Sequence, residues 1–360
     1  MCIIANKFLL LPSLMFETAK GDALFSLLLL FVVDILCLPL FFKCKKEFPE
    51  MKFCDILQKL FSKIGGKIIF TILLVFFFLK ALLTFSIAYV YLSQQVYLDD
   101  FFWIAIISIF PVVSHGVVKG VRTVARTIEL FFMIIVAGFI LCLFFSFFTP
   151  LSSLNLFTAN FNEIISTSYR NIFAFGDFLI LFLIIDKIQY KEKDKKMFYL
   201  YSLFAIILIF ALFVLFYLKY PITSFMHNNA LSDVLVFSVK FNAIGRLDII
   251  PMLTIMFVTI FQLEIFTFAF CDCFNNIFPR LSKVFSIVIF NIVFLITYYF
   301  FIGKYEIVVS SFSNILPIFA MINIYLFPLV LYLGIILNKF FKNKKLKGNF
   351  NNEKDTLSNS

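Results

Sequence analysis

Charged side chains and predicted backbone breaks inside long apolar runs are the features of this sequence that can do chemistry. Two such places occupy comparable positions in the two halves of the chain: Asn6 and Lys7 in its first apolar run, and Phe175, Gly176 and Asp177 in its sixth. An ionised side chain at a bilayer centre costs at least about 2.5–3.5 kcal/mol, so it persists where it faces a cavity or a partner. Gly176 can supply unwound backbone, and Asp177 can hold a cation, a proton or a ligand amine, or pair with Lys7. These five residues are the candidate ligand-binding residues; a packed kink that binds nothing is the alternative.

Further charged residues are candidates for coupling or structural roles. Lys80 lies too far from either end of its apolar run for its ammonium group to reach the membrane surface. Asp34 and Glu264 are its predicted partners. Arg126 and Glu129 are three residues apart and share one face of a helix, so we expect them to pair and to close a cytoplasmic interface.

No pattern of a known catalytic or metal site is present. The sequence contains no Gly-rich phosphate loop, no His-Glu-x-x-His and no Gly-x-Ser-x-Gly. His115 and His227 are far apart and are interpreted as interfacial residues, and the seven cysteines form neither a disulfide framework nor a zinc spacing. We predict that the chain is not an enzyme and that it needs no cofactor or metal.

Composition identifies the class of protein that must position these residues. Of the 360 residues 62% are hydrophobic and 14% are charged, and the mean hydropathy is +1.02, values that exclude a water-soluble domain. The runs are apolar on every face, as in Phe198 to Leu218, whereas barrel strands alternate polar with apolar residues. The formal net charge of +10 comes from lysines in loops between apolar runs, where they set topology, so no nucleic-acid partner is expected. The sequence predicts an all-α polytopic protein in a lipid bilayer.

Apolar runs between charges and turn residues predict ten transmembrane helices. Their approximate ranges are 3–16, 22–42, 68–92, 101–118, 127–149, 172–186, 197–218, 247–270, 284–302 and 311–338. Most of the 31 Lys and Arg residues fall in alternate loops and in the C-terminal tail, so both termini are predicted to be cytoplasmic. The first run is too short to cross a bilayer unless part of it is missing or re-entrant, and a start codon assigned too late is the preferred explanation over a signal peptide.

The order of the runs predicts an internal repeat. Breaks in the first and sixth of ten helices suggest a five-plus-five inverted repeat with a binding site at the midplane between the halves. We expect one transmembrane domain over residues 1–340, with repeat one at about 1–149 and repeat two at about 172–338. Residues 341–360 are expected to form a disordered cytoplasmic tail.

Five short elements, in order along nearly the whole chain, resemble one family. They are Phe8 to Ser13 with Lys20 to Ala23, Lys46 to Pro49, Gly120 with Ala125-Arg126 and Glu129, Phe173 with Phe175-Gly176-Asp177, and Arg246-Leu247-Asp248. Together they resemble the GerAB-type spore germination permeases, the B subunits of nutrient germinant receptors. The sequence departs from that family at Arg122, where an acid is usual, and at Asp177, where the family has Glu.

The resemblance implies a fold, a site and partners. The family is similar to the amino acid, polyamine and organocation (APC) transporter superfamily, whose LeuT-like inverted repeat agrees with the topology above. It implies a small, amino acid-like nutrient ligand, an A-type membrane subunit and a C-type lipoprotein as partners, and a place in the inner membrane of the spore or in the cell membrane. It also marks Asp248 as a coupling or structural charge, together with Lys80, Arg126 and Glu129. In proton-coupled relatives of the superfamily an ammonium group such as that of Lys80 can replace a bound sodium ion.

Three functions stay open at this point. The first is a spore germination receptor subunit that binds a small nutrient. The second is a proton-coupled amino acid permease. The third is a non-binding scaffold or degenerate paralogue.

Overall fold

The computed structural model describes the helices of the chain and the segments that join several of them. The described residues are 7, 11–96, 101–146, 151–152, 156, 158–188, 192–227, 230–231, 233, 249–301 and 315–339. Asn6, Asp248 and the predicted tail at 341–360 lie outside them. The described residues form helices and turns and contain no strand, which confirms the all-α prediction.

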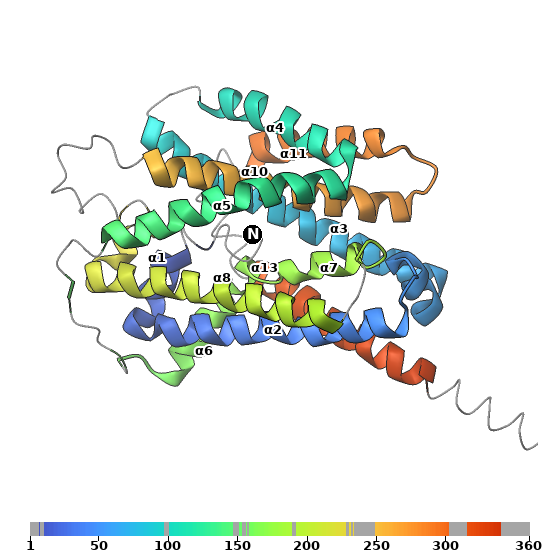
Figure 1. The fold of residues 1–360 in the computed structure, drawn as a ribbon, viewed down its shortest axis with the longest axis horizontal. Helices are drawn as coiled ribbons and strands as arrows, with labels where there is room; N and C mark the ends of the chain where they lie inside the picture. Colours follow the sequence, from blue (N-terminus) through green and yellow to red (C-terminus); the bar gives the residue numbers. More distant parts are fainter. Residues whose placement is uncertain are drawn as a thin grey trace, which may run out of the picture.

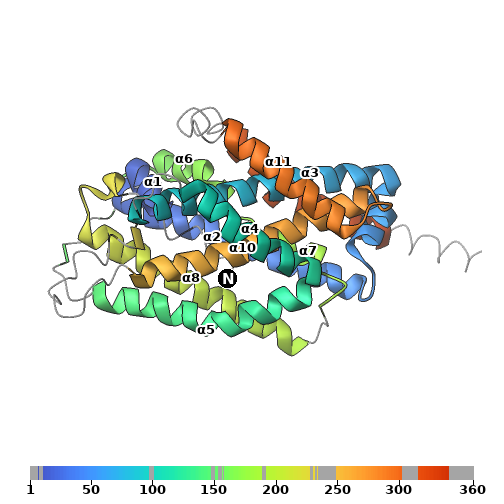
Figure 2. The same ribbon diagram turned by 90° about the horizontal axis from the view of Figure 1, so that it is seen from above.

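Long helices run side by side along the long axis of the molecule (Figures 1 and 2). The first half of the chain forms α1 (Leu11–Ala19), the turn η2 (Lys20–Asp22), α2 (Ala23–Glu47), α3 (Phe53–Val96), α4 (Phe101–Lys119) and α5 (Val121–Ser146). The second half forms α6 (Phe161–Asn171), the turns η3 (Ile172–Ala174) and η4 (Asp177–Leu179), α7 (Ile180–Leu183), α8 (Glu192–Lys219), the turn η5 (Ser224–Met226), α10 (Ile249–Ile277), α11 (Lys283–Phe301) and α13 (Ile315–Met321). A π-helical segment, η7 (Ile322–Leu326), continues α13, and helix then extends to Lys339.

Seven helices in the described part of the chain are long and apolar enough to cross a membrane. A further apolar helix, Ala105–Lys119, is shorter. The predicted first and second runs are joined in one stretch, Leu11–Glu47, and the predicted sixth run is divided into short turns and the four-residue α7. Because these pieces are too short to cross on their own, the ten-helix inverted repeat stays a prediction.

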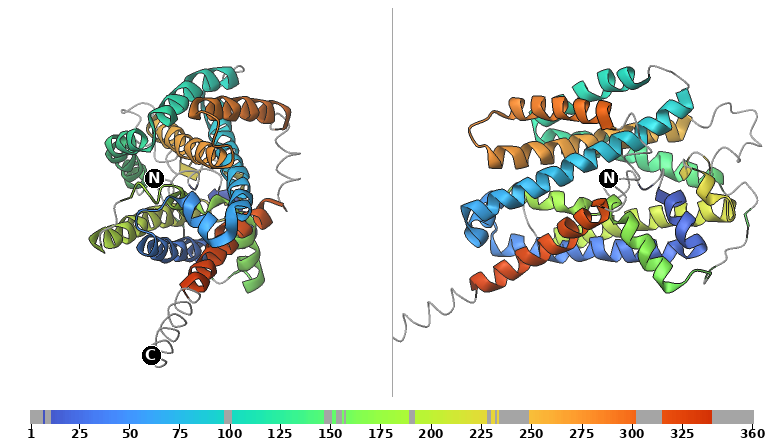
Figure 3. Two further views of the ribbon diagram at one scale, coloured as in Figure 1. Left: turned by 90° about the vertical axis from the view of Figure 1, so that its right-hand side faces the viewer. Right: turned by 180° about the vertical axis from the view of Figure 1, so that it is seen from behind.

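Helix α10 is central to one half of the bundle. It packs against α3, α4, α5 and α11, while α2 packs against α1, α6 and α8 (Figures 1 and 3). The interface of α10 with α5 is close, since a methyl group added at Gly138 would meet the Thr254 hydroxyl at 2.4 Å. The core between these helices is rich in phenylalanine, including the fully buried Phe76, Phe77 and Phe266. These rings fill the interior around the residues discussed below.

Helix α6 leads directly into the broken segment and is held by polar contacts to the first two helices. The hydroxyl groups of Thr18 on α1 and Thr167 on α6 lie 2.6 Å apart, and the Ser26 hydroxyl donates to the Ile164 carbonyl at 2.9 Å. The Asp22 carboxylate accepts hydrogen bonds from the backbone amides of residues 158 and 159, both at 2.6 Å, just before α6 begins. The start of the broken segment is therefore fixed to α1 and α2.

We expect the loop at 187–196 and the tail after Lys339 to face the cytoplasm, and the segments 150–170 and 220–245 to face the opposite side, because lysines are retained on the cytoplasmic side. The ends of α2 and of the last helix lie together, since Lys339 Nζ is 2.6 Å from Glu47 Oε1. The side on which each segment lies can be measured with single cysteines introduced into a variant without the native cysteines. An impermeant maleimide labels them before permeabilisation on one side and only after it on the other. A tail and a 220–245 segment on the same side would contradict the predicted topology.

Candidate functional site

The backbone leaves helical geometry at Phe175 and Gly176, between the turns η3 and η4. Gly176 has φ +85°, in the left-handed region that favours glycine. A Cβ atom at this position would lie 2.4 Å and 2.6 Å from two side-chain carbon atoms of Ile324, which belongs to the π-helical segment η7. Glycine is therefore required here both by the backbone angle and by the close approach of the last helix.

A carboxylate on α2 stabilises this break. The Gly176 amide donates to Asp34 Oδ1 at 2.8 Å, across 142 residues of sequence, in place of a helical hydrogen bond. Asp34 is buried, and its second oxygen, Oδ2, has no hydrogen-bond partner among the described residues. One turn further along α2, the Cys37 thiol donates to the Ile324 carbonyl at 3.6 Å. Helix α2 thus contacts both the broken segment and the last helix.

Two ammonium groups meet the carboxylate of Asp177. Lys7 Nζ lies 3.1 Å from Oδ2, and Lys80 Nζ of α3 lies 2.9 Å from Oδ1. All three side chains are at most 3% exposed, so the ions are shielded from water. In a medium of low dielectric constant such ions are stable only when they are paired, and here each carboxylate oxygen has a cation. Both carboxylate oxygens of Asp177 are consequently paired with lysines in this conformation.

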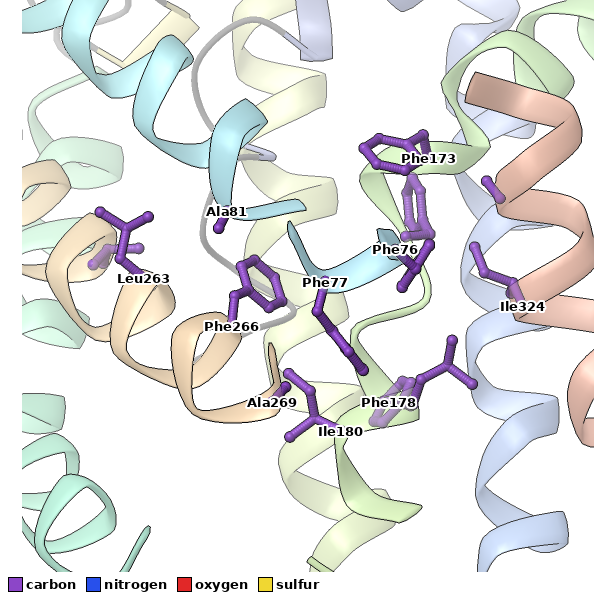
Figure 4. Close-up of a cluster of buried hydrophobic side chains, with 14 of the residues drawn as sticks. Phe76, Phe77, Ala81, Phe173, Phe178, Ile180, Leu263, Phe266, Ala269 and Ile324 are labelled. Atoms are coloured by element: carbon purple, nitrogen blue, oxygen red, sulfur yellow. The ribbon is translucent and has the colours of Figure 1, made fainter. Parts of the chain in front are cut away.

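Aromatic rings surround the two ammonium groups. Lys7 Nζ lies 4.6 Å from the centre of the Phe175 ring, and Lys80 Nζ lies 5.6–5.9 Å from the centres of Phe173, Phe76 and Phe266. Figure 4 shows the ring of Phe173, from the broken segment, next to that of Phe76 on α3, while the ring of Phe266 on α10 lies next to Phe77. Cations within about 6 Å of a ring centre are attracted to its face. The rings hold the ammonium groups without neutralising them.

The charged cluster, defined as Lys7, Asp34, Lys80 and Asp177, has two formal charges of each sign. Asp34 lies within electrostatic reach of Lys7, Lys80 and Asp177. The cluster contains one free acceptor, Asp34 Oδ2, within the described part of the chain. Its lysines and aspartates can therefore pair with one another, or one such pair can open and bind the carboxylate and ammonium groups of a zwitterion.

The structure brings four of the five candidate ligand-binding residues together, since Lys7, Phe175, Gly176 and Asp177 are in or next to the cluster. The fifth, Asn6, lies outside the described residues. Sequence reasoning missed the role of Asp34 at the Gly176 amide. The signal for this role in the sequence is the position of Asp34, an acidic residue deep in the second apolar run.

Some predictions about the other charged residues are wrong. Lys80 pairs with Asp177, rather than with Asp34 or Glu264, because the broken segment brings Asp177 to the face of α3 that carries Lys80. Arg126 and Glu129 are both exposed on α5, and no ion pair joins them in the ranges that the structure describes. Asp248 lies outside those ranges.

These features define a class of protein: a multi-pass, all-helical membrane protein with a broken helix whose buried carboxylate is paired with two ammonium groups. Residues 1–305 match the family model described as "Spore germination protein". The chain belongs to this family of spore germination permeases, which confirms the predicted resemblance. No curated protein matches the chain.

Proposed function

We propose that the chain is the membrane-embedded B subunit of a nutrient germinant receptor and that it binds a small zwitterionic nutrient, such as an amino acid, at the charged cluster. Membership of the spore germination permease family supports a role in germination. The observation that carries the proposal is the charged cluster itself: two ammonium groups and two carboxylates, all buried, beside a glycine whose backbone is not helical. A ligand with one ammonium and one carboxylate group matches this arrangement.

Binding exchanges ion pairs within the cluster. The ligand carboxylate replaces Asp177 as the partner of Lys7 or Lys80, and the ligand ammonium is accepted by Asp34 Oδ2 and by the released Asp177 oxygen. The exchange changes no net charge, so no ion is left unpaired in lipid. A conformational change follows only if the ligand binds the two arrangements with different affinity, and the Lys7–Asp177 pair supplies that difference because it competes with the ligand.

The remaining elements of the proposal concern the assembly. In the proposed five-plus-five arrangement, with broken spans at 3–16 and 172–186, the cluster would lie between the two repeats. An A-type membrane subunit and a C-type lipoprotein would receive the conformational change in the inner membrane of the spore, with both termini of this chain in the cytoplasm. Lys80, Arg126, Glu129 and Asp248 are proposed as the coupling or structural charges.

A proton-coupled amino acid permease is the second candidate function. It is favoured by one observation, the ammonium group of Lys80 at the carboxylate of Asp177 in the core of the bundle, because a proton moving between such groups could drive transport. A receptor needs only a ligand-dependent difference between two conformations. Accumulation of substrate distinguishes the two functions.

We expect purified protein in liposomes to show little or no accumulation of radiolabelled amino acids under an imposed pH gradient, while spores lacking the chain lose germination with at least one of the common amino acids. Lys80→Ala liposomes and protein-free liposomes are the controls. Gradient-driven uptake by the native chain that is lost in Lys80→Ala would establish the permease instead. Spores that germinate normally without the chain would contradict the receptor function.

A further inference from the structure

Glu264 is a second ionisable group deep in the helical bundle, and the proposed function does not use it. It lies in the middle of α10 and is 4% exposed. Its Oε2 atom has no hydrogen-bond partner within the described ranges, and no ion pair involving Glu264 occurs there. An ionised carboxylate left unpaired at such a depth is strongly destabilising.

A glycine on α4 provides the space for this carboxyl group. A Cβ atom at Gly116 would lie 2.4 Å from Glu264 Oε1 and 2.8 Å from its Cδ. The carboxyl group therefore occupies the volume that the methyl group of an alanine would need. It lies at the contact between α4 and α10.

The carboxyl group is on a different face of α10 from the charged cluster. Phe266, whose ring lies 5.9 Å from Lys80 Nζ, follows Glu264 by two residues, which is about 200° around a helix. Thr267 shares the face of Glu264 more closely, is fully buried, and its hydroxyl group has no partner within the described ranges. The site is thus independent of the nutrient-binding proposal.

No ion pair joins Glu264 to a described residue of the segments packed against α10. The charged residues and histidines along the described parts of the packed helices are His115 and Lys119 on α4, Arg122, Arg126 and Glu129 on α5, Lys283 on α11, and Asp55, Lys59, Lys63, Lys67 and Lys80 on α3; the other titratable groups there are Cys54, Tyr89 and Tyr91 on α3, Cys142 on α5, and Tyr298 and Tyr299 on α11. Those on α4, α5 and α11 that could supply a positive charge are exposed, and those on α3 other than Lys80 lie in its first third. The exposed Lys187, in the turn after α7, lies over the Phe268 ring of α10, toward Asp272 on the same helix. On α4, Val113 and Val117, which flank Gly116 in sequence, are buried.

The number of available ligands decides what Glu264 can bind. Calcium requires about six to eight oxygen ligands and magnesium about six, and no group of three His, Cys, Asp or Glu side chains gathers in the described part of the chain. A proton needs only the one carboxyl group. The neutral acid also removes the cost of an unpaired charge in a low-dielectric contact.

We propose that Glu264 is a proton-binding site, and that α4 and α10 pack closely at Gly116 only while its carboxyl group is protonated. When the proton leaves to water, the carboxylate must become hydrated, which requires the two helices to separate at this point. The contact of α4 with α10 then responds to pH independently of the ligand site.

Dicyclohexylcarbodiimide tests the protonation directly, because this apolar reagent reacts with protonated carboxyl groups in membranes. The acid O–H adds across a C=N bond of the reagent, and the acyl group then moves to nitrogen, which leaves a stable adduct without any oxidant or leaving group. In full-length protein in liposomes, peptide mass spectrometry should find Glu264 modified several-fold more than the exposed Glu129 at neutral pH. The modification should fall as the pH rises. Sodium chloride and potassium chloride should have equal effects; protection by sodium alone would show a metal-ion site and overturn the proposal, as would absence of the Glu264 adduct at every pH.

A substitution separates protonation from packing. Glu264→Gln has the shape of the protonated acid, so the variant should unfold at the same temperature as the native protein at neutral pH and should lose the fall in stability that the native protein shows at alkaline pH. Gly116→Ala should lower stability at every pH, because the added methyl group meets the carboxyl group. If Glu264→Gln is as unstable as Gly116→Ala at neutral pH, the native carboxylate is ionised and paired, and the proposal is wrong.

Discussion

Asp177→Asn is expected to destabilise the protein by about 3–5 kcal/mol and to abolish the germination response, because removing one member of a buried ionic group leaves its partners unpaired. Two ammonium groups, those of Lys7 and Lys80, depend on this carboxylate at 3.1 Å and 2.9 Å. In the amide one carboxylate oxygen becomes an NH2 group, which cannot accept a hydrogen bond from the ammonium group beside it, and the negative charge is lost. Thermal unfolding of purified protein and germination of spores carrying the variant are the two measurements.

Three variants control this experiment. Asp177→Glu keeps the charge and matches the residue usual in the family, so it should be the mildest change at this position. Adding Lys80→Met to Asp177→Asn should recover part of the lost stability, because Lys7 and Asp34 then remain as one charge of each sign. Lys339→Met breaks the half-exposed pair with Glu47 and should cost about 0–1 kcal/mol, as exposed ion pairs do. Equal stability of Asp177→Asn and Asp177→Glu would contradict the role of the ion pairs.

Gly176→Ala is expected to lower stability by about 2–5 kcal/mol, from backbone strain and overpacking together. The strain arises at φ +85°, and the overpacking arises because the methyl group would lie 2.4 Å from a side-chain atom of Ile324. Gly176→Leu should abolish the nutrient response while the protein still inserts into the membrane. Unfolding temperatures, membrane fractionation and germination measure these effects.

Gly120→Ala is the matched control for Gly176→Ala. Gly120 also has a positive φ, +91°, but no atom lies within 4 Å of the Cβ position, so only the strain of about 1–2 kcal/mol remains. Ile324 is buried, so Ile324→Ala alone is destabilising, and adding Gly176→Ala to that variant should cost only the backbone strain. If Gly120→Ala and Gly176→Ala are equally destabilised, the contact with Ile324 has no energetic importance and the last helix does not define the site.

The break in the sixth apolar run could be predicted from the sequence because a glycine and an acid inside such a run are exceptions that lipid does not tolerate without a partner. The same reasoning identified Lys7 as a partner for Asp177. It could not identify Asp34 as the acceptor for the Gly176 amide, because depth in an apolar run says nothing about which side of a helix faces which neighbour. The wrong partners predicted for Lys80 have the same origin. Asp34, Asp177 and Glu264 all lie deep in apolar runs, and only the tertiary arrangement determines which of them pairs with Lys80.

Hydropathy also describes helix length better than helix continuity. The predicted runs 68–92, 197–218 and 247–270 correspond to the helices 53–96, 192–219 and 249–277, with differences of up to about seven residues at their ends, except that α3 begins well before residue 68 and has a non-helical residue at Ser62. The broken segment at 172–183 has the hydropathy of a span but not its geometry, because Gly176 interrupts the helical hydrogen bonds. Composition alone does not distinguish a continuous membrane-spanning helix from a broken one.

The order in which the buried ions are synthesised has a consequence for how the protein is made. Lys7, Asp34 and Lys80 all enter the membrane before the ribosome reaches Asp177, the partner that pairs with both lysines. Until then the nascent first half of the chain carries an excess ammonium group among apolar helices, at a cost of at least about 2.5–3.5 kcal/mol on the insertion scale. The early helices must therefore stay near the translocon or at the lipid surface until η4 arrives, and a chain truncated before residue 177 is expected to be degraded instead of accumulating as a stable half.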